Sequence, residues 1–344
     1  MAQRAEKAMK RFATGLIVGK FAPLHCGHER LINAALAQCD TVLLLSYSVP
    51  ELPGCEPEKR QRWLQQRFPQ CQSIVLTPER VKAWQLPAIP HNEDSADSHR
   101  HYVATVCEQV FRQRPQAVFS GEDYGDGFAA VLSERFNQPV THVRLQRGAE
   151  PDAPSGTLIR ADVHRYHAML ADEVYRDFVL RICLLGGEST GKSTLSKALA
   201  EALNTTFVAE FGREYWEQKQ GELGYHDLLH IARTQVQREE AAQPAQYLVC
   251  DTSPLTTLFY TLHQFGHAPQ ELHRLAERDY ALIVLCDADF DFVQDGTRQG
   301  EDFRRLQQAW YERELARRKL PFIRVRGPVS ERIMQILTHL ATLH

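Results

Sequence analysis

The sequence has no long apolar run, no excess of one charge and no close pair of cysteines. No stretch approaches the roughly 20 apolar residues of a membrane span, so no membrane partner is expected. The formal net charge of −3 gives no general attraction to a polyanion. The eight cysteines form no C-x-x-C pair, which argues against a zinc cage or a disulfide framework. This usage favours a reducing compartment, and we expect a cytoplasmic protein.

The first residues also lack two signals. "MAQRAEKAMKRFATG" has no apolar stretch of the kind found in secretory signals. Only about fourteen residues precede the first predicted strand, too few for a three-helix DNA-binding module, so no nucleic-acid partner is expected. The chain has no low-complexity segment or internal repeat. Its 344 residues, 43% of them hydrophobic, suffice for two domains with separate cores.

The first half alternates strand-like and helix-like segments. Helices are predicted over 28–39, 57–68 and 99–114, and strands over 14–21, 40–48, 72–78, 116–125 and 138–146. This alternation predicts an α/β fold with a doubly wound parallel sheet, whose ligands bind beyond the carboxyl ends of the strands. The polar stretch 91–101 is expected to be a mobile loop.

A second α/β series begins at "DFVLRICLLGG". Its strands are predicted over 177–187, 205–211, 245–254, 280–289 and 320–327, and its helices over 192–203, 214–241, 254–279 and 303–319. A helical stretch over 160–178 joins the two series. We therefore predict two doubly wound domains, residues 1–178 and 179–344.

The second domain opens with a phosphate-binding sequence. Residues 186–193, "GGESTGKS", fit G-x-x-x-x-G-K-[ST] between an apolar strand and a helix, the context that a P-loop requires. Backbone N–H groups of this loop would surround the ATP phosphates, Lys192 would reach the β- and γ-phosphates, and the Ser193 hydroxyl would bind Mg²⁺. The other predicted nucleotide contacts of this loop are Gly187, Glu188, Ser189, Thr190, Gly191 and Thr194.

Acidic and basic residues near predicted strand ends complete a phosphoryl-transfer site. Asp251 would hold the metal or its water, and Glu210 could accept a hydroxyl proton or bind a ribose, with Arg213 nearby. Which of the two carboxylates is the base stays open, and both could instead be helix N-caps. The stretch 289–305 contains Arg298, Arg304 and Arg305. It suggests a lid that neutralises the transferred phosphoryl group, or merely a solvated face.

The first domain contains "GKFAPLHCGH" at 19–28. His25 and His28 lie at a predicted helix start, where N–H groups and the helix dipole favour anions, and Lys20 adds charge. Gly19 and Phe21 belong to the same predicted nucleotide contact. A metal pair is the alternative, but no third ligand lies near in sequence.

A second anion-binding stretch lies far downstream. "PSGTLIR" at 154–160 supplies Ser155, Thr157 and Arg160 at another predicted helix start. Together the two motifs resemble the nucleotidyltransferase superfamily that transfers AMP or CMP from a nucleoside triphosphate. The resemblance implies a Rossmann-like domain in which these residues bind the triphosphate, with His28 nearest the α-phosphate. It also places Glu122 and Asp123 of "SGEDYG" opposite the nucleoside.

The order of the two domains carries a more specific resemblance. An HxGH nucleotidyltransferase followed by "LLGGESTGKS", "AEFGREYWE" and "QDGTRQ" is similar to the NadR family. That resemblance implies a ribosylnicotinamide kinase and a nicotinamide-mononucleotide (NMN) adenylyltransferase, each using ATP and Mg²⁺. Their small-molecule substrates would be nicotinamide riboside and NMN.

Several alternatives remain open from the sequence. Trp84 could stack on the pyridine ring or be an ordinary core or surface residue. The first domain could act on another phosphate acceptor such as phosphopantetheine, and the second on another nucleoside. The chain could also be a nucleotide sensor with weak catalysis, and a homo-oligomer is not excluded.

Overall fold

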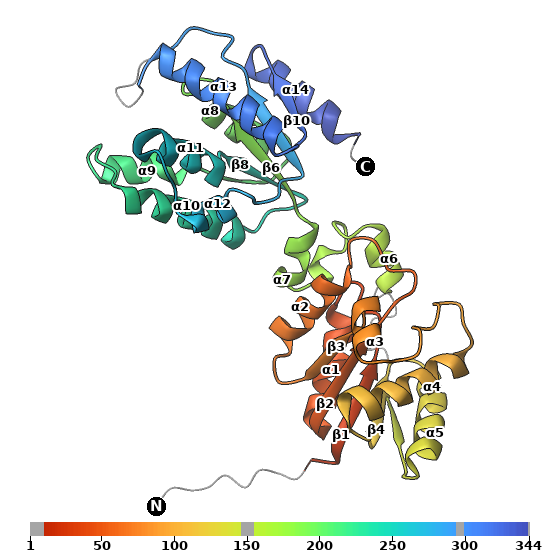
Figure 1. The fold of residues 1–344 in the computed structure, drawn as a ribbon. Helices are drawn as coiled ribbons and strands as arrows, with labels where there is room; N and C mark the ends of the chain where they lie inside the picture. The colour runs from red at the N-terminus through yellow and green to blue at the C-terminus, as the bar shows by residue number, and fades with distance from the viewer. Residues whose placement is uncertain (1–9, 146–154, 294–298, 343–344) are drawn as a thin grey trace, which may run out of the picture. The chain divides into compact units, whose positions relative to one another are not determined.

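The computed structural model describes residues 10–145, 155–293 and 299–342. The chain divides into two compact units, Met1–Phe178 and Val179–His344, and each unit has a parallel sheet between two layers of helices (Figure 1). The predicted fold class, two doubly wound α/β domains, is confirmed.

The sheet of the first unit has the strand order β3-β2-β1-β4-β5 in the described residues. Its strands are β1 (Phe12–Val18), β2 (Cys39–Ser46), β3 (Gln72–Val75), β4 (Ala117–Ser120) and β5 (Thr141–Arg144), and every neighbouring pair is parallel. The chain runs outward from β1 through β2 and β3, then crosses to β4 on the other side of β1. The carboxyl ends of β1 and β4 therefore form the switch point of the sheet, where doubly wound folds bind ligands.

Helices cover both faces of this sheet. They are α1 (Cys26–Gln38), α2 (Pro57–Arg67), α3 (Pro78–Ala83), α4 (Ala96–Val106), α5 (Tyr124–Phe136), α6 (Gly156–Ala161) and α7 (Asp172–Tyr175). One core joins the sheet to α1, α2, α6 and α7, and the other joins it to α4 and α5. Strand residues alternate between the cores, with Ile17 in the first and Leu16 in the second.

Four segments of the first unit differ from the prediction, the first being helix α3, which no predicted helix covers. Helix α5 lies between two strands that were expected to follow one another; its glycine-rich start hides the helical periodicity. Helix α4 begins at Ala96 with Ser95 as its N-cap, so only the first part of 91–101 is loop. The segment 160–178 is broken into short helical turns, and Leu170 and Val174 bury into the first unit's core.

The second unit has the strand order β10-β9-β6-β8-β7 in the described residues, again all parallel. Its strands are β6 (Leu180–Leu185), β7 (Thr206–Val208), β8 (Tyr247–Asp251), β9 (Leu282–Cys286) and β10 (Phe322–Val325). The central strand β6 leads directly into the predicted P-loop. That loop therefore lies at the carboxyl edge, beside the ends of β8 and β9.

Helices α8 (Lys192–Ala202) and α14 (Val329–Leu340) pack on one face of this sheet. The opposite face is covered by α10 (Tyr225–Ala241), α11 (Pro254–Phe265), α12 (Gln270–Leu275) and α13 (Glu301–Arg317). Helix α9 (Phe211–Gln218) packs on α10 through Phe211. The sequence prediction missed α14, although its buried positions Arg332, Ile336 and Leu340 recur at helical spacing.

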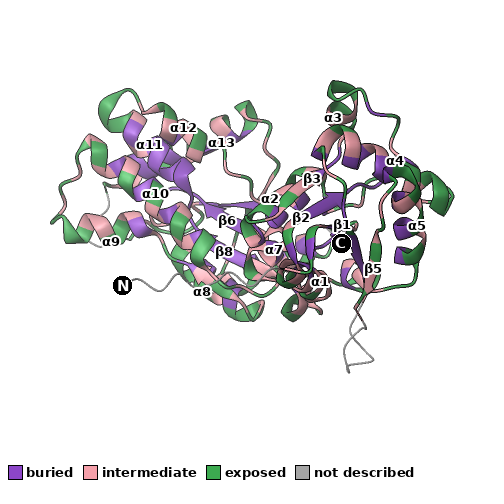
Figure 2. Ribbon diagram, turned by 90° about the horizontal axis from the view of Figure 1, so that it is seen from below, coloured by how far each residue is buried: buried purple, intermediate pink, exposed green. Residues whose placement is uncertain are grey.

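The burial pattern agrees with two independent cores. In Figure 2, buried residues concentrate in strands such as β6 and β8, while the outer faces of the helices are exposed. All eight cysteines are free thiols, and six of them are buried. None of the helices in the described ranges is both long enough and apolar enough to cross a membrane.

Candidate functional site

The backbone of residues 186–193 is shaped for phosphate binding. Gly186 and Gly191 have φ values of +149° and +77°, which disfavour any residue with a Cβ atom. A Cβ at Gly187 would lie 2.6 Å from the Arg304 carbonyl oxygen. Glycine is required at these positions because the chain turns tightly against its neighbours, as the motif predicted.

The side chains of this loop fold inward. The Lys192 ammonium donates to the carbonyl oxygens of Gly186 (2.9 Å) and Gly187 (2.8 Å). The Thr190 hydroxyl donates to the Gly187 carbonyl oxygen at 2.8 Å. Lys192 therefore lies across the mouth of the loop, within reach of a bound phosphate.

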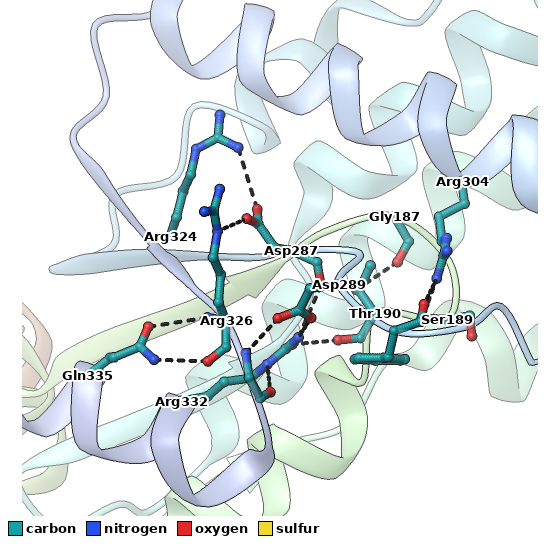
Figure 3. A network of polar contacts seen from close by, with 12 residues as sticks. Gly187, Ser189, Thr190, Asp287, Asp289, Arg304, Arg324, Arg326, Arg332 and Gln335 are labelled. Atoms are coloured by element: carbon teal, nitrogen blue, oxygen red, sulfur yellow. Dashed lines mark hydrogen bonds and ion pairs between the residues drawn. The ribbon is translucent and has the colours of Figure 1, made fainter.

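Arginine and glutamine side chains from distant helices support the loop. Arg332 of α14 is only 2% exposed. Its guanidinium donates to the carbonyl oxygens of Thr190 (2.8 Å), Gly327 (2.8 Å) and Asp287 (3.1 Å), and it pairs with Asp289 (Figure 3). One buried side chain thus joins the P-loop to the ends of β9 and β10.

Helix α13 holds the other side of the loop. The backbone N–H groups of Gly187 and Glu188 donate to the side-chain oxygens of Gln308 (3.0 Å) and Gln307 (2.9 Å). Arg304 is 4% exposed and donates to the Phe290 carbonyl oxygen at 3.0 Å. The amides of Gly187 and Glu188 are therefore satisfied by protein side chains.

A cavity of about 310 Å³ opens from the P-loop toward α9, α10 and α11. Its wall includes the loop residues Glu188 to Thr194 and, from other elements, Glu210, Arg213, Trp216, Gln235, Thr252, Ser253, Thr256, Tyr260, Gln264, Gln299 and Gln307. Glu210 and Arg213, predicted from sequence to face a substrate, both line it. The cavity is large enough for a nucleoside beside the phosphates.

The carboxylates of Glu210 and Asp251 both lie near Lys192. Burial, followed by the repulsion of Asp251, raises the pKa of Glu210 to about 7, while Lys192 and Arg213 oppose the shift. Burial also raises the pKa of Asp251, with the Ser193 hydroxyl and Lys192 opposing it. Glu210 occupies the N-cap position of α9 without a side-chain capping bond, and Ser253 rather than Asp251 caps α11. The carboxylates are thus available to a ligand.

The environment of Asp251 fits a magnesium ion. The side chain is 2% exposed, and its Oδ1 atom is buried without a hydrogen-bond partner. Such an orphan acceptor is costly unless a ligand or water satisfies it. A carboxylate next to a serine hydroxyl is the oxygen donor set of a P-loop magnesium site.

Three cavity residues were missed in the sequence analysis. Gln235 of α10 is 3% exposed; its Oε1 accepts from the Phe211 N–H at 3.0 Å, and its Nε2 is buried without a partner. Tyr260 donates to Glu188 Oε1 at 3.0 Å, and Trp216 lies in the wall. Trp216 lies inside the quoted "AEFGREYWE" segment but was given no role, and no motif marks Gln235 or Tyr260, because they lie on helices that meet only on packing.

The predicted lid is only partly described. Arg298 lies outside the described residues. Arg304 and Arg305 lie in the first turns of α13 instead of a loop: Arg304 is buried, and Arg305 is 73% exposed and pairs with Glu301 at 3.2 Å. The backbone N–H of Gln299 donates to Glu188 Oε2 at 2.8 Å, so the chain after the gap lies against the P-loop.

In the first unit, the HxGH segment forms the start of α1. His25 is the N-cap, and its Nδ1 accepts from the Gly27 N–H at 3.1 Å. The rings of His25 and His28 lie 3.9 Å apart. Within the described residues no group of three His, Cys, Asp or Glu side chains could hold a metal. The two histidines are therefore arranged as a pair at a helix start, where an anion binds favourably.

The fold brings the second motif to the same place. Ser155 caps α6 by accepting from the Leu158 N–H at 3.3 Å. A Cβ on Gly156 would lie 3.6 Å from His25 Nε2 and 3.6 Å from the Ala22 carbonyl oxygen. Arg160 donates to that same carbonyl oxygen and to the Thr157 hydroxyl at 3.0 Å. Residues about 130 positions apart thus form one cluster that contains both histidines and Arg160.

Burial and neighbouring charges shift the pKa values of the basic residues in this cluster. Burial, and then the neighbouring His25, lowers the pKa of His28 well below its ordinary value, so its ring is neutral at pH 7. The pKa of Lys20 is lowered by desolvation and then by Arg160 and Arg60. The Nδ1 atom of His28 is buried without a hydrogen-bond partner, and a neutral imidazole carries a single N–H donor, so Lys20 and Arg160 supply the positive charge.

The remaining predicted residues lie at the edge of the first unit. Glu122 and Asp123 are exposed on the turn that follows β4, and Asp123 pairs with Arg144 of β5. This turn lies at the switch point, as expected for a nucleoside contact. Trp84 is the C-cap residue of α3 and is 39% exposed, so it is a surface residue. Gly19 and Phe21 lie at the start of the loop after β1, where Phe21 is buried against His28.

Comparisons with known proteins find similarity in both units of the chain. A family model described as an AAA domain matches residues 181–332. The trifunctional NAD biosynthesis/regulator protein NadR of Salmonella typhimurium strain LT2 is 27% identical over 324 residues, 83% of this chain and 71% of that protein. The chain is similar to NadR over most of its length.

Other NadR proteins are similar to this chain to about the same extent. NadR of Escherichia coli strain K12 is 27% identical over 325 residues, covering 83% of this chain and 71% of the relative. A crystal structure of NadR with NAD and AMP-PNP aligns with a TM-score of 0.66, 20% identity, and coverage of 97% and 96%. A structure of NadR with NR aligns at 0.64 and 22%, covering 91% of this chain and 90% of that one. The predicted family resemblance is therefore confirmed, and the architecture of both units is shared.

Proposed function

We propose that the second unit phosphorylates nicotinamide riboside with ATP to give NMN, and that the first joins NMN to AMP from a second ATP. The products of the second step are NAD and pyrophosphate. The observation that carries this proposal is the P-loop with its adjoining cavity in the second unit and the Lys20, His25, His28 and Arg160 cluster in the first, in a chain similar to NadR. The solved NadR complexes with NR and with NAD and AMP-PNP support the choice of substrates.

In the proposed kinase step, the riboside hydroxyl oxygen attacks the γ-phosphorus while the bond to ADP breaks. The P-loop amides and Lys192 hold the phosphates in line. Glu210 takes the hydroxyl proton, since its pKa of about 7 suits a base at neutral pH and Asp251 is assigned to the metal. Asp251 and Ser193 would hold Mg²⁺, which supplies charge neutralisation on the phosphates when bound.

In the proposed adenylyl transfer, a phosphate oxygen of NMN attacks the α-phosphorus and pyrophosphate leaves. No side chain becomes bonded to the substrate. Lys20, Thr157 and Arg160 would hold the triphosphate, and His28 would donate a hydrogen bond to the reacting phosphate as charge develops. Catalysis here consists of alignment and charge stabilisation.

An HPLC assay tests the whole proposal. Incubation with nicotinamide riboside and MgATP should yield NMN first and NAD afterwards, with pyrophosphate formed only in the second step. Replacing NMN by phosphopantetheine should abolish pyrophosphate release. Tight ATP binding without either product would instead support a sensor.

The Glu210 carboxylate should give the kinase step a distinctive pH dependence. Because the base must be ionised, kcat/KM for the riboside should rise with pH and level off above about pH 7. Glu210→Gln should remove that rise and most of the activity. A carboxyl whose folded pKa is raised destabilises the native state as pH increases through that value, so the same variant should melt higher at pH 8. An unchanged pH profile in Glu210→Gln would remove Glu210 from the role of base.

The buried amide of Gln235 should contribute to riboside binding. Gln235→Leu removes the unpartnered Nε2 donor, and we expect the riboside KM to rise about tenfold with little change in kcat. Steady-state kinase kinetics measure this. Gln237→Leu, on the exposed face of the same helix, is the matched control and should leave KM unchanged. If both variants behave alike, Gln235 does not contact the substrate.

A further inference from the structure

A serine, a histidine and an aspartate form a hydrogen-bonded line at the end of β4. Ser120 Oγ lies 2.8 Å from His142 Nε2, and His142 Nδ1 lies 2.7 Å from Asp126 Oδ1. The three residues come from β4, β5 and the first turn of α5. This is the order of groups in a hydrolytic triad, and the proposed reactions do not use it.

The cluster is not built to attack a substrate. Ser120 is 0% exposed, and its hydroxyl also donates to the Glu122 carbonyl oxygen at 2.6 Å. The His142 side chain is 7% exposed. A Cβ at Gly125 would lie 2.2 Å from His142 Nε2 and 2.7 Å from Ser120 Oγ. The imidazole is therefore packed beneath the turn, in a space that only glycine at 125 leaves open.

A chain of hydrogen bonds connects the turn to the exposed carboxylate of Asp126. Asp126 is 77% exposed, and as a carboxylate it only accepts, so it requires the proton on His142 Nδ1. The other ring nitrogen then faces Ser120. The single hydroxyl proton of Ser120 lies between two acceptors, His142 Nε2 and the Glu122 carbonyl oxygen. Asp126 thus fixes the ring, and the ring and Ser120 together fix the peptide after Glu122.

The turn that this cluster holds lies at the switch point of the first sheet. Residues 121–123 lie at the carboxyl edge of β4, next to β1, where the HxGH loop begins. Strand β5 also holds the turn from the side, through the ion pair between Arg144 and Asp123. Two side chains of β5 therefore fix the segment that presents Glu122 and Asp123 at the switch point.

We propose that Ser120, His142 and Asp126 are positioning residues that hold the 121–125 turn in the conformation that receives the ATP nucleoside in the first unit. ATP is chosen over NMN because the proposed triphosphate ligands Thr157 and Arg160 follow β5 in the chain. The choice of ligand rests on the proposed adenylyl transfer; the ordering of the turn does not.

Hydrogen–deuterium exchange on the full-length protein tests the ordering. Ser120→Ala and His142→Gln should speed amide exchange in residues 121–126 about tenfold, with exchange in β1 and in the second unit unchanged. Asp126→Asn should have a smaller effect, because its amide oxygen still accepts from Nδ1. Glu134→Gln removes the same charge from an exposed position of α5 and should change nothing. Unaltered exchange in folded Ser120→Ala and His142→Gln would overturn the proposal.

Steady-state kinetics test whether the ordered turn contributes to ATP binding. In pyrophosphate-release assays with NMN, the two variants should raise the KM for MgATP five- to tenfold, with kcat and the NMN KM changing less than about twofold. Unchanged exchange in β1 of the same preparations reports that the first unit is folded, and riboside phosphorylation, which belongs to the second unit, should be unchanged. An equal loss in both activities, or a fall in kcat alone, would contradict a positioning role. If the wild-type protein releases no pyrophosphate, the proposed function fails, and the exchange experiment still decides whether the cluster orders the turn.

Discussion

Lys192→Ala should abolish riboside phosphorylation and leave adenylyl transfer intact. The Lys192 ammonium lies over the P-loop, 2.8–2.9 Å from two of its carbonyl oxygens, where it would stabilise charge on the transferred phosphoryl group. Loss of such a group in a site shielded from water costs about a thousandfold in kcat. The measurement is NMN formation from nicotinamide riboside, beside NAD formation from supplied NMN.

The two-unit architecture explains why only one activity should fall. Each unit has its own sheet and its own cores, so a change in the P-loop does not disturb the packing of the first unit. Arg274→Ala removes a positive charge from an exposed position of α12 and is the matched control. Equal losses of both activities in a folded Lys192→Ala protein would contradict independent sites.

His28→Ala should have the converse effect, lowering kcat for adenylyl transfer about a hundredfold while kinase activity stays unchanged. The neutral ring of His28 lies among the residues of α1 and α6 that would bind the triphosphate. Its hydrogen bond to the reacting phosphate would strengthen as charge develops on the α-phosphate. The KM for ATP should therefore change much less than kcat. Pyrophosphate release from NMN and ATP measures both constants.

A second histidine variant controls for the loss of an imidazole. His101 is exposed on α4 of the same unit, and His101→Ala should leave adenylyl transfer unchanged. If His28→Ala weakens ATP binding as strongly as turnover, the ring acts in the ground state, and the proposed transition-state role is wrong.

The structure also shows what stabilises the kinase site from a distance. Arg332 reaches the P-loop from the last helix, 142 residues along the chain from Thr190. Its guanidinium matches three carbonyl oxygens and a carboxylate at once, which a lysine cannot do because it lacks the planar fork. A motif search does not find such a residue, since its importance depends on where α14 packs.

The sequence by itself determined the fold class and located the two segments that we propose bind phosphate. Alternating strands and helices imply parallel sheets, and the glycines of "GGESTGKS" imply a loop that no larger residue can form. Local order was enough there, because a P-loop and a helix start are built from consecutive residues. The sequence prediction missed α3, α5 and α14, and in α5 the glycine-rich start disguises the helical periodicity.

Only the tertiary structure decided which distant side chains meet. It placed Gly156 beside His25, Gln235 and Trp216 in the kinase cavity, and His142 under the turn after β4. It also buried both Glu210 and Asp251, which raises the pKa of each carboxyl through desolvation and through charges that other segments bring near. Such properties arise from packing between segments, and no spacing along the chain encodes them.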